Sequence, residues 1–161
     1  MAHNSRILAF DPGFERLGVA VVEKNKGKEI VVHSECIRSS PSLSFHDRLH
    51  IVVTAAEKMI EEYAPSAVAL EDIYFSKNQK TAMKIAEVRG ALIYIAKKHE
   101  LPIYEYAPQQ VKIAVTGYGK SDKNAIMRMI PKLVLLDSKK RLDDELDAIA
   151  IGLTCLASVK K

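Results

Sequence analysis

The sequence has little cysteine and no long hydrophobic run, and each absence excludes a class of protein. Its two cysteines, Cys36 and Cys155, lie far apart and lack the short spacing of a metal site. No apolar run reaches the roughly 18 residues that a membrane-spanning helix requires, and no signal peptide is apparent. We therefore expect a cytoplasmic protein with reduced thiols and no membrane partner.

Low-complexity segments and internal repeats are also absent from the sequence. The chain has 161 residues, of which 48% are hydrophobic, and this is enough to form a sizeable core. Such a composition argues against a disordered protein. We expect one domain that covers residues 1–161.

Positive charge is concentrated in the middle of the chain. Residues 74–141 hold 14 Lys and Arg against 5 Asp and Glu, whereas residues 1–73 hold 8 against 11 and residues 142–161 hold 2 against 4. Tyrosine and phenylalanine are interspersed with these basic residues. This pattern is typical of a protein that binds a polyanion, although a solvated basic surface would have the same composition.

The hydrophobic pattern predicts strands first, and then strands that alternate with helices. Strands are expected over residues 6–10, 17–23, 29–37, 67–71 and 101–106, and helices over residues 44–63, 78–99, 108–115, 122–130 and 142–158. This order predicts an α/β domain with a mixed central sheet of about five strands, flanked by helices.

The helix expected over residues 78–99 is apolar nearly all round in its second half, at residues 91–96. Such a helix is buried on more than one side. Gly90 and Ala91 would permit a close approach by another element. The second buried side is therefore either a subunit interface or the interior of the same domain, and the pattern alone does not decide between them.

Two acidic residues each close a predicted buried strand. Asp11 follows residues 6–10, and Glu71 follows residues 67–70. If these strands are parallel neighbours, both carboxylates project from the same edge of the sheet. Acidic groups at the end of buried strands are costly to desolvate unless something pairs with them.

Further acidic residues begin the last predicted helix. Asp147 borders the apolar stripe of this helix, and both Asp144 and Asp143 lie one turn before it. Periodicity does not decide which of these two points inward. Each acid alone has an ordinary explanation, as a turn cap for Asp11 or as a partner of the helix dipole for the others.

Taken together, these acids form a set without a basic partner in the neighbouring sequence. Carboxylates brought close to one another repel and need a cation, and oxygen ligands without His or Cys suit Mg²⁺ or Mn²⁺ better than zinc. A pair of hard dications held by carboxylates is equipment for phosphodiester hydrolysis. The residues therefore predict a metal-dependent nuclease.

Four segments resemble successive blocks of the RuvC family of Holliday-junction resolvases: "ILAFDPGFERLGVAVVE", "VALEDIYFSKNQKTAMKIAEVRGALI", "LPIYEYAPQQVKIAVTGYGKSDK" and "DDELDAIAIGLT". The resemblance covers nearly the whole chain. It implies a ribonuclease H-like fold and a homodimer with two active sites. It also implies paired nicking of four-way junction DNA with two Mg²⁺ per site, Mn²⁺ being possible, and cooperation with the branch-migration proteins RuvA and RuvB.

The resemblance also assigns roles to individual residues. It implies that the catalytic, metal-binding set is Asp11, Glu71, Asp144 and Asp147, and so favours Asp144 over Asp143. It places Tyr74 in contact with the junction and Lys112 and Lys123 near the active site and the DNA. Lys77 and Lys120, also in the basic middle of the chain, are further candidates for DNA binding.

Two departures from the family pattern affect only local DNA contacts. Val19-Ala20 replaces a usual glycine after the first turn, and Asn124 replaces a glutamine. Two other functions remain as alternatives, a YqgF-like nuclease that acts on RNA and a junction-binding module without catalysis. An actin-like ATPase would need a second lobe, for which the chain is too short.

Overall fold

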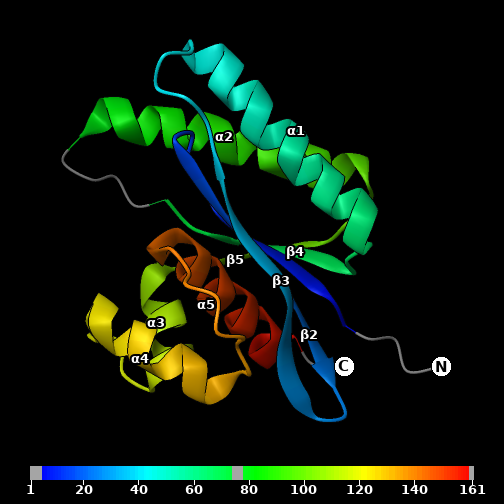
Figure 1. Cartoon of the computed structure of the whole chain (residues 1–161), viewed down its shortest axis with the longest axis vertical. Helices are drawn as coiled ribbons and strands as arrows, with labels where there is room; N and C mark the ends of the chain where they lie inside the picture. The colour runs from blue at the N-terminus through cyan, green and yellow to red at the C-terminus, as the bar shows by residue number, and fades with distance from the viewer. Residues whose placement is uncertain (1–4, 74–77, 160–161) are drawn as a thin grey trace.

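The computed structural model describes residues 5–73 and 78–159 and has a five-stranded mixed sheet with helices on both faces (Figure 1). All ten predicted elements are present, and their ends shift by at most three residues. The strands are β1 (Ile7–Asp11), β2 (Arg16–Asn25), β3 (Lys28–Arg38), β4 (Ala67–Glu71) and β5 (Ile103–Tyr106). The helices are α1 (Phe45–Tyr63), α2 (Gln79–Lys98), α3 (Pro108–Thr116), α4 (Lys123–Leu133) and α5 (Asp143–Ser158). In the part of the chain that the structure describes, no helix could cross a membrane.

The sheet has the strand order β3-β2-β1-β4-β5. The first three strands form an antiparallel meander, and β1, β4 and β5 run parallel to one another. Strand β1 therefore lies at the centre of the sheet and is buried on both faces. This burial explains why its sequence is a continuous apolar run rather than an alternating one.

The two faces of the sheet carry separate hydrophobic cores. Leu8 and Phe10 of β1 pack with α1 and α2, whereas Ile7 and Ala9 pack with α5. Figure 1 shows α1 and α2 on one side of the sheet and α3, α4 and α5 on the other. Alternate side chains of each central strand thus belong to different cores.

Small residues let α5 lie close to the sheet. The sheet face under this helix is lined with alanines, among them Ala9, Ala20 and Ala69. On the helix, a Cβ added at Gly152 would come within 2.7 Å of Val22 Cγ2. A larger side chain at this crossing would therefore force the helix and the strand apart.

Helix α5 is buried more broadly than one apolar stripe predicts. Ala157, near the end of the helix, is exposed, whereas Glu145 in the first turn is only 3% exposed. Local sequence patterns do not predict the burial of Glu145, because its partners come from a distant strand and from the connection between α4 and α5.

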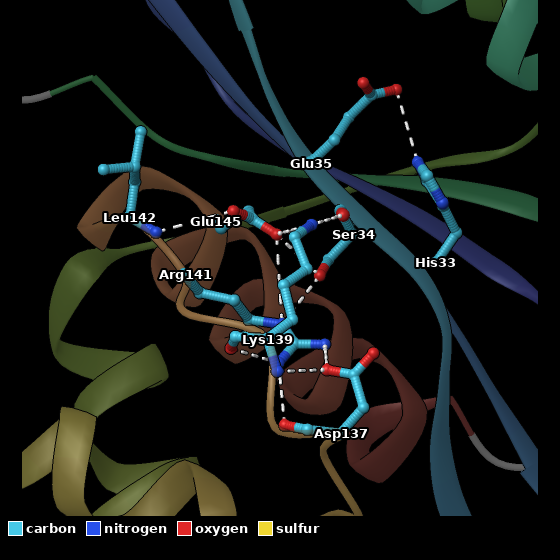
Figure 2. A network of polar contacts seen from close by, with 8 residues as sticks. All are labelled: His33, Ser34, Glu35, Asp137, Lys139, Arg141, Leu142 and Glu145. Atoms are coloured by element: carbon cyan, nitrogen blue, oxygen red, sulfur yellow. Dashed lines mark hydrogen bonds and ion pairs between the residues drawn. The ribbon is translucent and has the colours of Figure 1, made fainter.

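Glu145 is the centre of a polar network that joins these segments (Figure 2). Its carboxylate accepts hydrogen bonds from Ser34 Oγ on β3 and from Lys139 Nζ, both at 2.9 Å. Arg141 Nε also donates to Ser34 Oγ at 2.9 Å, and the guanidinium pairs with Asp137 at 2.8 Å. The network fixes the first turn of α5 against the edge strand of the sheet.

We predict that Glu145→Gln lowers the free energy of unfolding at pH 7 by about 1–3 kcal/mol, because it weakens charge-assisted hydrogen bonds in a buried network. Urea unfolding measures this change. Glu61→Gln, at an exposed position of α1, is the control and should change stability by less than about 0.5 kcal/mol. Equal stability of the Glu145→Gln protein and the wild type would contradict the role of the network.

The same variant has a predicted pH dependence. Burial acts to raise the pKa of Glu145, but hydrogen bonds from Lys139 and Ser34 outweigh it and leave the pKa below its ordinary value. A carboxyl group with a lowered pKa in the folded state contributes its full stabilisation at pH values above its unfolded pKa of about 4.3. This contribution to the free energy of unfolding is lost as the pH falls through the pKa of the folded state. The difference between the wild type and Glu145→Gln should therefore shrink below about pH 4.

Candidate active site

The parallel pairing of β1 and β4 brings two acidic residues to the same edge of the sheet. Phe10 lies opposite Leu70 in the register, so Asp11 and Glu71 both stand where these strands end. The expected neighbourhood of the two carboxylates is therefore confirmed. Backbone geometry alone is enough to place them together.

A glycine on β2 brings the last helix to the same place. Gly18 lies opposite Asp11 in the antiparallel pair, and a Cβ added to it would lie only 1.9 Å from the backbone oxygen of Asp144. Any side chain at this position would push the first turn of α5 away from the sheet. The absence of a side chain thus determines how closely Asp144 approaches Asp11.

The structure distinguishes between the two acids that periodicity left open. The side chain of Asp143 is 71% exposed, whereas that of Asp144 is 25% exposed and that of Asp147 is 31% exposed. Asp144 and Asp147 also act electrostatically on Asp11. Asp144 therefore faces the strand ends, and Asp143 faces the solvent.

The four acids lie close enough to alter one another's protonation. Burial, followed by the charges of Asp147, Glu71 and Asp144, raises the pKa of Asp11 to about 8. Burial and the charge of Asp147 raise the pKa of Glu71 to about 7. At neutral pH the cluster therefore retains protons unless a cation compensates for its charge.

Basic residues stand on both sides of the cluster. Lys123 Nζ lies 3.2 Å from Asp147 Oδ2, and Lys112 acts to lower the pKa of Glu71 against the dominant effects of burial and Asp147. On the other side, Arg16 Nε lies 3.5 Å from Asp144 Oδ2. The sequence reasoning missed Arg16, and only its position five residues after Asp11 could have indicated it.

The basic residues on the two sides of the cluster border two separate hollows. The first, of about 200 Å³, is bordered by Glu71, Asp147, Lys112 and Lys123. The second, of about 380 Å³, is bordered by Asp11, Asp144, Arg16, Phe14 and Thr81. The acidic cluster therefore lies between two hollows, each of which has a cationic wall.

The donor chemistry of the cluster fits a hard dication. All four side chains offer carboxylate oxygens, the ligands that Mg²⁺ and Mn²⁺ prefer. Within residues 5–73 and 78–159, no three His, Cys, Asp or Glu side chains converge as closely as bound ligands would. The carboxylates repel one another, and Asp147 is held in an ion pair with Lys123, so both effects oppose such convergence. A dication bound between the carboxylates would attract all of them.

The predicted DNA-contacting residues fall into two groups. Lys112 and Lys123 border the first hollow, and Lys120 is exposed in the loop between α3 and α4. Tyr74 and Lys77 lie outside the described residues, so their expected contacts stay predictions.

The domain is similar to solved resolvase structures. A structure titled "T. thermophilus RuvC in complex with Holliday junction substrate" is 30% identical and has a TM-score of 0.86, covering 93% of this chain and 92% of that one. The yeast mitochondrial Holliday junction resolvase Ydc2 is 13% identical with a TM-score of 0.69, covering 95% of this chain and 78% of that one. The second likeness shows the fold alone. The expected ribonuclease H-like fold is thus confirmed.

Sequence comparisons extend over the same region. The family model described as crossover junction endodeoxyribonuclease RuvC matches residues 7–155. The RuvC protein of Thermosipho melanesiensis is 38% identical over 152 residues, 94% of this chain and 96% of that protein. The RuvC protein of Caldicellulosiruptor saccharolyticus is 39% identical over 154 residues, 95% of this chain and 93% of that protein. The chain therefore belongs to the RuvC family of crossover junction endodeoxyribonucleases.

Proposed function

We propose that this protein resolves Holliday junctions in DNA recombination and repair by nicking two opposing strands. The observation that carries this proposal is the meeting of four carboxylates at one sheet edge, in a chain of the RuvC family. Relatives named crossover junction endodeoxyribonuclease RuvC match this chain over nearly its whole length. An RNA-processing nuclease and a non-catalytic junction-binding module are not favoured, because neither explains this match together with the acidic cluster.

Asp11, Glu71, Asp144 and Asp147 are the proposed catalytic and metal-binding residues. Two Mg²⁺ ions held by these oxygens, or Mn²⁺ in their place, would supply an activated water and stabilise the leaving oxygen. Asp11 stands at the centre of the set, since the other three carboxylates all act on it.

The basic and aromatic residues are proposed to hold the DNA. Lys112 and Lys123 stand beside the acids and would contact the phosphates next to the scissile bond, and Lys120 and Lys77 would contact the backbone further away. Tyr74 would stack on a base unpaired at the crossover. RuvA and RuvB remain proposed partners, and a cytoplasmic location agrees with a DNA substrate.

A homodimer is proposed through the outer face of α2. Met83 and Tyr94 on this face are 63% and 69% exposed, and a Cβ added to Gly90 between them would meet no atom within 4 Å. Residues 91–96, for which the pattern left open a subunit interface or the domain interior, lie mostly in the interior. Leu92 belongs to the core and Ile93 packs partly against it, so Tyr94 is the exposed apolar residue of this run.

We predict that Asp147→Asn slows junction cleavage on the order of 100-fold or more, as expected when a charge-stabilising group leaves an active site. Junction binding should persist, because it depends on phosphate contacts of the basic segment. Asp143→Asn is the matched control, since Asp143 also pairs with Lys123 but is largely exposed, and it should cleave normally. Normal nicking by Asp147→Asn in a single-turnover assay with Mg²⁺ would reject the assignment.

We predict that Gly90→Arg gives monomers and abolishes paired nicking. A Cβ added at Gly90 meets no atom within 4 Å, so the arginine can extend away from its own subunit, where it would block the close approach of a second helix. Sedimentation measures the oligomeric state, and a cruciform plasmid reports whether both strands are cut. Ala157→Arg, at an exposed position of α5 on the opposite face of the sheet, is the control and should stay dimeric. A dimeric, fully active Gly90→Arg protein would place the interface elsewhere.

A further inference from the structure

The hollow beside Asp11 and Asp144 has cationic features that the catalytic assignment does not use. Arg16, the first residue of β2, has a side chain that is 55% exposed, and its shortest contact with Asp144 is the 3.5 Å between Nε and Oδ2. In the described part of the chain, the guanidinium makes no side-chain hydrogen bond and forms no ion pair with any other acid. A guanidinium offers several donors in one plane, a geometry that matches a phosphate group.

A second cation beside this hollow is held by aromatic rings instead of an acid. Lys84 Nζ lies 5.2 Å from the centroid of the Phe14 ring and 5.4 Å from that of Phe45. Within the described residues, no carboxylate lies within ion-pair distance of Lys84. Phe14 is itself held by the buried Arg48, whose guanidinium lies 5.0 Å from the ring centroid. The charge of Lys84 is therefore positioned without being neutralised.

The remaining acid of this hollow is already engaged. Oε1 of Glu15 lies 3.8 Å from Nη1 of Arg48, and the Glu15 side chain is 67% exposed. Thr81, which also lines the hollow, belongs to the first turn of α2, and this turn contains no acidic residue. The partial positive charge of the helix N-terminus thus adds to that of Arg16 and Lys84.

We propose that this hollow is a second phosphate-binding subsite, in which Arg16 and Lys84 hold the cleaved DNA strand on the side of the scissile phosphate opposite to Lys112 and Lys123. The inference rests on the proposed function and extends it to the path of the strand. A strand with its scissile phosphate over the acids must continue in both directions, and each direction leads into a hollow with a cationic wall. Arg16 and Lys123 each pair with one acid of the cluster, Arg16 with Asp144 and Lys123 with Asp147.

The first test is the salt dependence of junction binding without divalent ions. Arg16→Ala should lower the slope of log affinity against log salt by about 1, because one phosphate contact is lost. The advantage of the wild type over the variant should then fall about fourfold between 50 and 200 mM salt. Lys24→Ala, at the other end of β2 and paired with Glu29, is the control and should leave the slope unchanged. An unchanged slope in Arg16→Ala would overturn the proposal.

A second test locates the contact on the DNA. One phosphate near the scissile position is replaced at a time by a neutral methylphosphonate, and junction affinity is measured. At the phosphate that Arg16 contacts, the replacement should weaken binding of the wild type but should cause no further loss of affinity in Arg16→Ala. For Lys112→Ala the insensitive position should lie on the other side of the scissile phosphate. Lys84→Ala, on a different element, should share the side of Arg16. Two results would overturn the subsite. In the first, Arg16→Ala and Lys84→Ala lose affinity at every methylphosphonate position, as the wild type does. In the second, the insensitive positions of Arg16→Ala and Lys112→Ala lie on the same side of the scissile phosphate.

Failure of this inference can be told apart from failure of the proposed function. If the wild type does not cut four-way junctions with Mg²⁺, the proposed function itself is wrong. If the wild type cuts them while Arg16→Ala and Lys84→Ala bind as the wild type does, only the second subsite is wrong. Arg16→Lys should recover part of the lost affinity, because it restores a charge without the planar fork.

Discussion

The close contact between α5 and the first two strands is the constraint on which the acidic cluster depends. At one end of the crossing, Gly18 leaves no room for a side chain beneath the backbone of Asp144, and further along α5 Gly152 allows Val22 and Ala9 to approach. The spacing between helix and sheet sets the position of Asp144 and Asp147. Asp11 and Glu71 are set independently, by the parallel pairing of β1 and β4. The site exists because these two arrangements coincide at one sheet edge.

This arrangement costs stability. The pKa of Asp11 is raised to about 8, first by burial and then by its acidic neighbours, so folding disfavours its charged form. The hydrophobic core between α5 and the sheet and the network around Glu145 hold the first turn of α5 in place against this repulsion. A site that is unfavourable in isolation but compensated by a dication is the expected design for a metal-dependent nuclease.

The sequence predicted the elements well because their signals are local. Apolar runs, periodicity and breakers specify strands and helices. Because two predicted strands each end in an acid, the sequence also predicted that Asp11 and Glu71 lie at one edge of the sheet. Periodicity could not choose between Asp143 and Asp144, which both lie one turn from Asp147, and the packing at Gly18 was needed to decide. The burial of Glu145 was not predictable, since Ser34 is 111 residues away in the chain.

The second cationic hollow was missed for the same reason, because Arg16 and Lys84 come from elements that only the fold brings together. Tyr74 and Lys77 lie outside the described residues, and their roles stay predictions. For Arg16, Lys84 and Glu145, the sequence lacked distance information between separate elements. The family resemblance supplied part of it for the four acids and for Lys112 and Lys123, but not for Arg16 or Glu145.

The most direct test of the central claim is the rate of single-turnover junction cleavage by Gly18→Ala. The added methyl group should displace the first turn of α5, and a misplacement on the order of 1 Å can slow an enzyme about 100-fold. We expect a loss of at least this size with Mg²⁺ present, in a protein that still folds and binds the junction. Cleavage at the wild-type rate would show that the approach of Asp144 to Asp11 is not what creates the active site.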